Sequence, residues 1–500
     1  MNEPATLVAD VVDVVDVVLQ HARLAPSRIA VESGGRHVSY AELRAMVDAL
    51  AATLVERGLQ PGQLVVLAAD DELALIVGAL ATVASGGYFT VLRRALRDSV
   101  VLTTILAMKP AFVLADGLHH GLPGLDTVMF DPAALREGGG TRPVQDRLTG
   151  LSGSPRTCCL IVGSGSTGAP KVFTVSHAEE VSHLKTRVAA YALCPDDRVA
   201  GLSHAEFTAA RRHLFAALSA GATVKLRARG QDDWPQRMMV SNATVVQVPV
   251  VTLHALVKHF GGRPGVLREA RVLGIGGSEV SEPLRQATDR TICSQLHIVY
   301  GTNELGFLTI ASPDDWRGRP GTIGRPIAGI EMAVVGRQGD PVNPGEVGLL
   351  RFRKASMMIG YLNAPELTRR SFREGWFYPH DLGRVGADGL VQFLGRADDM
   401  MIFNGINIYP AEIENVMRTA PGVVDVAAVP YRHPVHQDVP VCAAVMDGDA
   451  HMDEAALLEW GRQRLGPVGP KKVFIVDRIP RDGQGKLLRP ELRDMIAKRG

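Results

Sequence analysis

The pattern that most constrains the fold is an alternation of short apolar runs with amphipathic stretches over about the first three hundred residues. Runs rich in β-branched residues, such as GQLVVLAA, CCLIVG and ATVVQVP, recur between segments of helical period such as SYAELRAMVDALAATLVERG. Continuous apolar strands that alternate with amphipathic helices are typical of α/β layers around mainly parallel sheets. The sequence therefore predicts a layered α/β architecture over roughly residues 10–310.

The texture changes after this region. From about residue 322 to 396 the chain carries short strand-like runs with Gly-rich turns, such as IEMAVVGRQGDPVNPGEVGLLRFR, which predict a small β-rich sub-domain. The remainder mixes helical and strand patterns in a compact module of domain size. Because 500 residues exceed what one core usually organises, we expect a large domain over residues 1–396 and a small α+β domain over residues 397–500.

Composition excludes several classes of function. The 54 Lys and Arg against 53 Asp and Glu leave a net charge of +1, so no global field favours nucleic acid or anionic lipid. The five cysteines, an odd number that includes the adjacent Cys158 and Cys159, form neither a disulfide framework nor a spaced metal site, which favours a reducing cytoplasm. The long uncharged stretch Ala74–Leu92 contains three glycines and polar residues, so we expect a buried helix, a turn and a strand there and no membrane span.

The segment IVGSGSTGAPKVFTV contains the most prominent candidate for a phosphate-binding loop. Glycines let backbone N–H groups face a ligand, hydroxyls add donors, and Lys171 adds positive charge. Gly163 and Gly168 match the first half of a Walker loop, but two residues separate Gly168 from Lys171 and Val172 stands where a hydroxyl is needed. On this segment alone, a phosphate cradle and a flexible surface turn both remain open.

Companion motifs give the loop its context. SGSTGAPK resembles the phosphate loop of the adenylate-forming superfamily, which includes acyl- and aryl-CoA synthetases, adenylation domains of nonribosomal peptide synthetases and firefly luciferase. In the same order along the chain, VYGTNELG resembles YGxTE, GWFYPHDLGRV resembles GWFxTGDLGR, GRADDMMIFNGINIYPAEIE resembles GRxDDxIxxxGxNIYPxEIE, and PRDGQGKLLRPELR resembles PRTxxGKxxRxxLR. Five ordered blocks over nearly the whole chain make the resemblance specific.

The reaction that this resemblance implies is attack of a carboxylate on the α-phosphorus of ATP, which gives an acyl-adenylate and pyrophosphate. Two anions must meet, so positioning and charge neutralisation matter more than proton transfer. By resemblance, Glu304 would hold Mg²⁺, Tyr300 would stack on adenine, and Asp381 would accept both ribose hydroxyls with Arg396 beside it. The other nucleotide-binding residues that the resemblance implies are Ser164, Gly165, Ser166, Thr167, Gly168, Lys171, Gly276, Gly277, Ser278, Gly301 and Thr302.

Two further residues are assigned by the same resemblance. Lys486, in the turn DGQGK, would reach from the small domain to the substrate carboxylate and the α-phosphate. Asp398 corresponds to the hinge about which the small domain rotates, so that a second face can serve a thiol acceptor. Taken alone, Lys486 would be a solvated surface lysine and Asp381 a turn residue.

The chain departs from the family pattern at several positions. Gly163 replaces the leading hydroxyl of the phosphate loop, Val172 replaces a glycine, Asn303 replaces Thr, and His380 replaces Gly directly before Asp381. Since each principal charged residue remains, these changes favour a specialised enzyme over a weakened one.

The acid pocket can be located by counting from the motifs. Thr208 stands where amino-acid-activating relatives carry an aspartate, so an α-amino substrate would leave a buried charge unpaired at a cost of about 3 to 5 kcal/mol. Gln247 and Arg212 make one side polar, which favours an acid with a hydroxyl, amino or second carboxylate group; Arg212 could equally lie on a solvated helix face, and His204 could be structural. The candidates are His204, Phe207, Thr208, Ala209, Arg212, Gln247, Gly274, Gly276, Val299, Phe307 and Leu308.

The function that we expect is ATP- and Mg²⁺-dependent adenylation of a carboxylic acid, aryl or small and functionalised, followed by transfer to a thiol of CoA or of phosphopantetheine on an acyl or peptidyl carrier protein. Two alternatives remain open at this stage. One is an adenylating enzyme with a nitrogen acceptor or an inorganic oxyacid substrate, and the other is a nucleotide-binding relative without catalysis.

Overall fold

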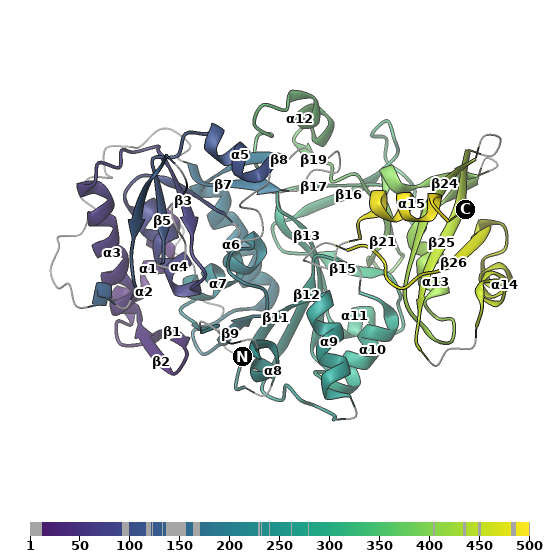
Figure 1. Cartoon of the computed structure of the whole chain (residues 1–500), viewed down its shortest axis with the longest axis horizontal. Coiled ribbons are helices and arrows are strands. Elements are labelled where there is room, and N and C mark those ends of the chain that lie inside the picture. Colours follow the sequence, from purple (N-terminus) through teal and green to yellow (C-terminus); the bar gives the residue numbers. More distant parts are fainter. Residues whose placement is uncertain are drawn as a thin grey trace.

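A computed structural model describes most of the chain. The described residues are 13–92, 100–116, 122, 124–132, 134–136, 157–163, 171–228, 231, 233–239, 241–261, 263–278, 280–403, 406–433, 437–448, 452–481 and 487–499. Six predicted site residues lie outside them, namely Ser164, Gly165, Ser166, Thr167, Gly168 and Lys486. The predicted α/β class is confirmed by two large sheets with helices packed on them (Figure 1).

The first sheet has six strands in the order β6-β5-β3-β4-β7-β8 and is parallel except for its last pair. The strands are β3 (Leu64–Ala68), β4 (Tyr88–Val91), β5 (Phe112–Ala115), β6 (Asp126–Met129), β7 (Thr157–Gly163) and β8 (Lys171–Ser176). Every residue of β3 is buried, as expected for a central strand covered on both faces. The antiparallel pair places Gly163 opposite Lys171, so the two ends of the phosphate-loop segment lie side by side.

The second sheet has fifteen strands and forms the middle of the molecule. Its order is β18-β19-β17-β20-β21-β15-β14-β13-β12-β11-β9-β10-β1-β2, with β16 paired to β17. The strands are β1 (Ile29–Ser33), β2 (Arg36–Ser39), β9 (Arg198–Gly201), β10 (Thr223–Leu226), β11 (Val245–Pro249), β12 (Val272–Gly276), β13 (Leu296–Thr302), β14 (Gly306–Ala311), β15 (Thr322–Pro326), β16 (Glu331–Val335), β17 (Gly348–Arg353), β18 (Phe372–Arg373), β19 (Trp376–Phe377), β20 (Asp381–Val385) and β21 (Val391–Arg396). The strands from β1 to β13 on this path are parallel apart from β2, whereas those from β14 onward pair antiparallel.

The helices of this part follow local sequence signals. The helix α3 begins at a capping box in which Ser39 and Glu42 exchange hydrogen bonds. The stretch expected to form a buried helix, a turn and a strand does so as α4, a turn at residues 85–87, and β4. The helices are α1 (Val14–Leu19), α2 (His21–Leu24), α3 (Tyr40–Glu56), α4 (Glu72–Ala84), α5 (Val100–Ala107), α6 (His177–Tyr191), α7 (Thr208–Ser219), α8 (Trp234–Met239), α9 (Val250–Phe260), α10 (Glu282–Thr291), α11 (Pro313–Trp316) and α12 (Pro365–Ser371), with a 3₁₀ turn η2 (Ala134–Arg136).

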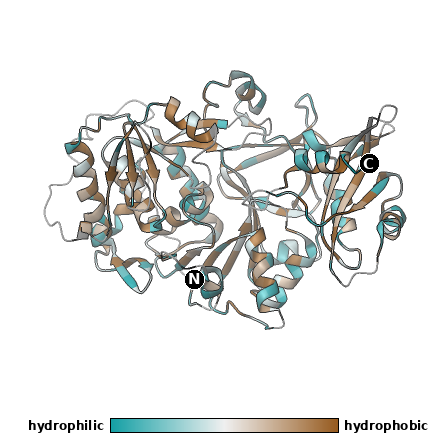
Figure 2. Ribbon diagram, in the orientation of Figure 1, coloured by the Kyte–Doolittle hydropathy of each residue, from teal (hydrophilic) through white to brown (hydrophobic). Residues whose placement is uncertain are grey.

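The helix α6 lies between the two sheets. It contacts β7 and β8 of the first sheet and β14 of the second, and it packs on α7. Its sequence, HAEEVSHLKTRVAAY, is unusually polar for a helix in such a place. Figure 2 accordingly shows teal segments in α6 beside the brown strands.

The C-terminal module packs beyond β21, at the green and yellow end of Figure 1. A 3₁₀ turn, η4 (Ala397–Asp399), joins it to the large sheet. Its elements are β22 (Met401–Phe403), β23 (Ile406–Ile408), α13 (Pro410–Met417), β24 (Val423–His433), β25 (Gln437–Met446), α14 (Glu454–Leu465), η5 (Gly466–Val468), β26 (Lys472–Ile475) and α15 (Arg489–Ala497). The expected α+β mixture is present, and the domain boundary at residue 396/397 stays a prediction.

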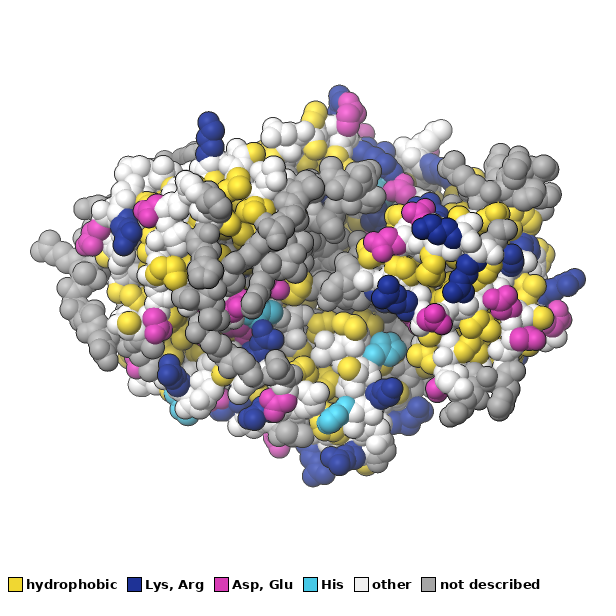
Figure 3. Space-filling model, viewed as in Figure 1, with side chains coloured by type: hydrophobic (Ala, Val, Ile, Leu, Met, Phe, Trp, Pro, Cys, Tyr) yellow, Lys and Arg dark blue, Asp and Glu magenta, His cyan; other side chains and the backbone are white. Residues whose placement is uncertain are grey.

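The structure shows the distribution of surface charge and the state of the cysteines, two features considered in the sequence analysis. On the face drawn in Figure 3, basic and acidic side chains are interspersed. All five cysteines lie in the described part and are free thiols, four of them buried. No helix among the described residues has both the length and the apolar character that crossing a bilayer requires.

Candidate functional site

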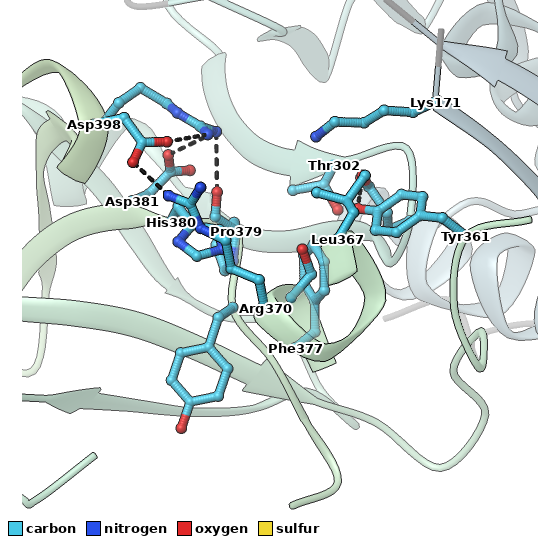
Figure 4. Close-up of a pocket in the computed structure, with 14 residues that line it drawn as sticks. Lys171, Thr302, Tyr361, Leu367, Arg370, Phe377, Pro379, His380, Asp381 and Asp398 are labelled. Carbon is cyan, nitrogen blue, oxygen red and sulfur yellow. Dashed lines mark hydrogen bonds and ion pairs between the residues drawn. The ribbon is translucent and has the colours of Figure 1, made fainter. Parts of the chain in front are cut away.

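A cavity of about 90 Å³ lies where the two sheets and the turn η4 meet (Figure 4). Segments that are far apart in sequence contribute to it, from β8 at one side to η4 at the other. The fourteen lining residues are Lys171, Thr302, Glu304, Tyr361, Leu367, Arg370, Ser371, Phe377, Tyr378, Pro379, His380, Asp381, Arg396 and Asp398. Six predicted site residues are therefore brought together here, namely Lys171, Thr302, Glu304, Asp381, Arg396 and Asp398.

Asp381 is the centre of one wall of the cavity. It is buried, with 6% of its surface exposed, and it pairs in register with Arg396 on the neighbouring strand. Tyr300 donates its hydroxyl proton to Oδ2 of Asp381 at 2.5 Å, and Nη1 of Arg396 lies 3.4 Å from Oδ1. Burial and the carboxylate of Asp381 raise the pKa of Tyr300 well above its usual value, so its phenol remains a neutral donor. The arrangement fixes a carboxylate with one aromatic ring and one guanidinium beside it.

Glu304 and Lys171 lie on the opposite wall, with Tyr361 between them. Tyr361 donates its hydroxyl proton to Oε1 of Glu304 at 2.7 Å. The ammonium of Lys171 lies 5.6 Å from the centre of the Tyr361 ring, within the range of a cation–π contact. Burial and the charge of Glu304 raise the pKa of Tyr361. The segment MMIGYLNAPE, which contains Tyr361, matched the family only weakly in sequence, and the role of this residue was missed there.

Asp398 lies between two arginines at the edge of the cavity. Arg370 of α12 donates to its Oδ1 at 2.6 Å, and Nη2 of Arg396 lies 3.8 Å from its Oδ2. Figure 4 shows these ion pairs as dashed lines. Asp398 thus connects the turn that leads to the C-terminal module with two elements of the large sheet region, while its role as a hinge stays a prediction.

His380 occupies the cavity in an uncommon backbone conformation. Its φ of 64° lies in the left-handed region, where a side chain other than glycine is strained by about 1 kcal/mol or more. Burial and the neighbouring Arg370 lower the pKa of His380 to about 4, so the imidazole is neutral at pH 7. Its Nε2 has no hydrogen-bond partner among the described residues. The side chain that replaces a glycine is therefore an available hydrogen-bonding group in the cavity wall.

The predicted glycines near the nucleotide site are required by close backbone approach. A Cβ on Gly276 would lie 2.6 Å from the carbonyl oxygen of Val299 on the neighbouring strand, and a Cβ on Gly301 would overlap the carbonyl oxygen of Gly306. Gly277 has a φ of 91°. Gly277 and Ser278 follow β12, which ends at Gly276, and Gly301 follows Tyr300 within the neighbouring strand β13; none of these four residues lines the cavity of Figure 4.

Three of the predicted acid-pocket residues are joined by Tyr191 of α6, which the sequence analysis missed. Its hydroxyl donates to Oε1 of Gln247 at 2.6 Å, and its ring meets Phe307 edge to face at 5.7 Å. A Cβ on Gly274 would overlap the Tyr191 hydroxyl. Tyr191 therefore fills the space that a side chain at position 274 would need and lies beside three residues predicted for the acid pocket.

Arg212 is a core residue that forms an ion pair with Glu180. Only 1% of its surface is exposed, so the alternative of a solvated helix face is wrong. Its Nε donates to both carboxylate oxygens of Glu180, at 3.0 and 2.8 Å, and Nη1 donates to the carbonyl oxygen of Asn303 at 3.0 Å. Arg212 thereby supports the turn that carries Glu304. Direct contact of Arg212 with an acid stays a prediction.

The other predicted acid-pocket residues lie at the start of α7 or in the sheet. His204 places Nε2 2.9 Å from the carbonyl oxygen of Asp70, and its Nδ1 accepts from the backbone of Glu206 at 3.2 Å, which is a structural arrangement. Phe207 precedes the first residue of α7, Thr208, and Val299 is buried in β13. Their contact with an acid stays a prediction.

Comparison with known proteins identifies relatives of this chain. Residues 18–362 match the model of the AMP-binding enzyme family, and residues 412–486 match that of the AMP-binding enzyme C-terminal domain. The chain is 30% identical over 491 residues to a feruloyl-CoA synthase of an Amycolatopsis species, covering 95% of this chain and 97% of the relative. It is 28% identical over 495 residues to a 3-hydroxybenzoate–CoA ligase of an Aromatoleum species, covering 93% of each.

Solved structures agree with this assignment. ATP-bound MatB from Rhodopseudomonas palustris superposes with a TM-score of 0.82 at 26% identity, over 96% of this chain and 98% of that one. O-succinylbenzoate coenzyme A synthetase from Bacillus subtilis, in complex with AMP, has the same TM-score at 22% identity, over 96% and 98% of the chains, and shows the shared fold. The resemblance inferred from the five motifs is confirmed.

Proposed function

The chain belongs to the family of AMP-binding enzymes, and from this premise we propose that it activates a carboxylic acid other than an α-amino acid with ATP and then transfers the acyl group to a thiol. The acid is aryl or small and functionalised. The acceptor is CoA or the phosphopantetheine of a carrier protein, and the reaction runs in the cytoplasm, where five free cysteines would stay reduced.

The observation that carries this proposal is the meeting of Lys171, Glu304, Asp381 and Arg396 around one cavity. Asp381, already fixed by Tyr300 and Arg396, offers carboxylate oxygens to the ribose hydroxyls. Lys171 and Arg396 both line the cavity and would place positive charge near the phosphates of a bound ATP. These charges lower the repulsion between the attacking carboxylate and the α-phosphate.

Magnesium fits the donor set of the cavity. Glu304 supplies a hard carboxylate oxygen, oriented by the hydroxyl of Tyr361, and one protein carboxylate together with substrate phosphates is a common environment for this ion. When bound, Mg²⁺ would neutralise phosphate charge. Glu304 would hold it, and Tyr361 would keep Glu304 aligned. Beyond the described residues, Lys486 would bring a further cation to the reacting carboxylate.

The proposal of an aryl or small functionalised acid as substrate rests on the side chains predicted to line the acid pocket. Thr208 offers no carboxylate for an α-ammonium group, and Gln247 with Tyr191 makes the floor polar. The relatives whose names state aryl acids, feruloyl-CoA synthase and 3-hydroxybenzoate–CoA ligase, support the same class.

Product analysis with defined variants tests the proposal. Purified protein is incubated with ATP, Mg²⁺ and single acids in the presence of CoA, pantetheine-loaded carrier or amines, and the products are identified by mass spectrometry. Lys171→Met should lower acyl-adenylate formation at least tenfold, about 1.4 kcal/mol, whereas the matched control Lys185→Met, on the exposed face of α6, should retain it. Amides in place of thioesters would overturn the assignment of a thiol acceptor.

A further inference from the structure

One face of α6 carries polar residues where a core helix normally carries apolar ones. Glu180, His183, Arg187 and Tyr191 follow one another at intervals of three, four and four residues, so they lie on a single face of the helix. All four are buried, with at most 4% of their surfaces exposed. This helix contacts β14, the strand that contains Phe307.

Cations outnumber anions within this buried cluster. Glu180 is the carboxylate on the α6 face, and Arg212 occupies both of its oxygens. Lys354 lies with Nζ 3.2 Å from Nδ1 of His183, and burial together with Arg212 lowers the pKa of Lys354 to about 7, so this group can lose its charge. A guanidinium, in contrast, keeps its proton and its charge near neutral pH. Among the described residues, Arg187 forms no ion pair with a carboxylate, since both oxygens of the nearby Glu180 already accept from Arg212.

Arg187 has unused hydrogen-bonding capacity. Only 2% of its surface is exposed, and its Nε and Nη1 have no hydrogen-bond partner among the described residues. Its guanidinium carbon lies 4.1 Å from the centre of the Phe307 ring, a cation–π contact that offsets part of the cost of burying the charge. Two buried donor nitrogens therefore lack an acceptor, which is costly unless a ligand supplies one.

The position of Arg187 connects it with the predicted acid pocket. Phe307 packs against both Arg187 and Tyr191, and Tyr191 in turn bonds Gln247 above Gly274. The cavity of the nucleotide site is lined by no residue of α6. An acceptor for Arg187 would therefore come with the acid and not with ATP.

We propose that Arg187 binds a compact oxyanion at the floor of the acid pocket. This inference rests on the proposed function and narrows its substrate class. The oxyanion is a second carboxylate, remote from the reacting one, on an organic acid, or it belongs to a small inorganic oxyacid that is itself the substrate. The unpaired Nε and Nη1 lie on different edges of the guanidinium, and each can donate a charge-assisted hydrogen bond to an oxygen of such a group.

Matched acids test this inference by pyrophosphate release and ATP–pyrophosphate exchange. The probes are benzene-1,3-dicarboxylate against 3-methylbenzoate, benzene-1,4-dicarboxylate against 4-methylbenzoate, butanedioate against pentanoate, and nitrite as the inorganic case. The wild type should favour the dicarboxylate at least tenfold in kcat/KM in one pair, or turn over nitrite. A preference for the dicarboxylate identifies a second carboxylate as the source of the oxyanion, and turnover of nitrite alone identifies the inorganic acid.

Arg187→Met should remove that preference, or the turnover of nitrite, and leave the KM for ATP within twofold. The matched control is Arg211→Met, which removes another buried arginine, on α7, whose guanidinium lies over Phe89 at 5.3 Å. This control should keep the preference. Because Arg187→Met can destabilise the core, Arg187→Lys is measured as a second variant, and it should retain part of the preference for the dicarboxylate or part of the turnover of nitrite. Thermal melting checks that both variants are folded.

The outcomes separate this inference from the proposed function. Exchange that occurs only with the monocarboxylates, or a preference that survives Arg187→Met, would overturn the role of Arg187 and leave adenylation standing. Absence of exchange with every acid in the panel, in a protein that binds ATP, would contradict adenylation itself. If neither Arg187 variant folds, the wild-type protein decides: a ratio of kcat/KM for dicarboxylate over monocarboxylate of at least ten in one pair, or turnover of nitrite, supports the role of Arg187, and the absence of both overturns it.

Discussion

The hydroxyl of Tyr361 donates to Glu304 at 2.7 Å, and the two residues come from segments 57 positions apart in the chain. This bond orients the carboxylate that the family resemblance assigns to Mg²⁺, and the same ring faces Lys171. Tyr361 is thus a positioning residue between the two charged groups of one wall of the cavity.

Tyr361→Phe should weaken the response to Mg²⁺ without removing the ring. A hydrogen bond to a charged group contributes about 1.5 to 3 kcal/mol, so the Mg²⁺ concentration for half-maximal activity should rise about tenfold or more. The measurement is a Mg²⁺ titration of pyrophosphate release at saturating ATP and acid. Tyr431→Phe, in the strand β24 of the C-terminal module, is the matched control and should behave as wild type. An unchanged Mg²⁺ response would show that Tyr361 does not position the metal ligand.

Asp381→Asn should impair ATP binding more than acid binding. The variant keeps the size of the side chain but loses the negative charge that Arg396 and Tyr300 surround. We expect the KM for ATP to rise at least tenfold while the KM for the acid changes little. Tyr300→Phe, which removes only the internal hydrogen bond, should have the smaller effect on the KM for ATP. Equal KM values in Asp381→Asn and wild type would remove Asp381 from the nucleotide site.

His380 provides a test of backbone strain. Because its φ is 64°, His380→Gly should be more stable than His380→Ala, with a free energy of unfolding about 1 kcal/mol higher. The pair Arg462→Gly and Arg462→Ala, at an exposed position within α14, should show the opposite sign by about 1 kcal/mol. Chemical denaturation of the four variants measures both differences, and the same sign at both positions would contradict the strain at His380.

Lys354 should make stability depend on pH above neutrality. Burial and Arg212 lower the pKa of Lys354 to about 7, below that of an unfolded lysine, so between pH 7 and 10 the unfolded chain binds more protons at this site than the folded one. The contribution of Lys354 to stability is therefore least favourable below pH 7 and improves as the pH rises. Relative to Lys354→Met, the wild type should gain at most about 1.4 kcal/mol per pH unit from pH 7 to 9. A constant difference between the two proteins over this range would contradict the lowered pKa of Lys354.

Asp398→Pro should separate the two half-reactions. Proline fixes φ and restricts the rotation expected at this position, while the other lining residues of the cavity, Asp381 among them, are unchanged. Adenylation should stay within a few-fold of wild type, whereas thioester formation should fall at least tenfold. Equal losses in both steps would contradict a hinge at Asp398. The ion pair with Arg370 is half exposed, so Asp398→Asn should change the free energy of unfolding by less than about 1 kcal/mol.

The sequence predicted several residues that meet in the candidate nucleotide site, because these residues stand in motifs with fixed internal spacing. Glu304, Asp381 and Arg396 each follow from such a block, and the structure brings them to one cavity with Lys171. Tyr361 was missed because its importance depends on a contact with a distant turn, which no local pattern shows.

The sequence predicted the fold class, but it did not predict which strands pair with one another. Alternation of strands and helices gave the α/β layers, and Gly-rich turns gave the short strands after residue 322. That these strands continue the large sheet through β14 and β15 could not be foreseen, since strand pairing between distant segments has no local pattern. Arg212 illustrates the same limit, because its partner Glu180 lies on another helix.

The most direct test of adenylation by this protein is ATP–pyrophosphate exchange by the wild type over a panel of aryl, acyl, β-amino and dicarboxylic acids. We predict exchange that requires both Mg²⁺ and a matching acid, with AMP and no ADP as the nucleotide product once a thiol is added. Tight ATP binding by calorimetry without exchange over the whole panel, or release of ADP and phosphate, would contradict adenylation as the function of this chain.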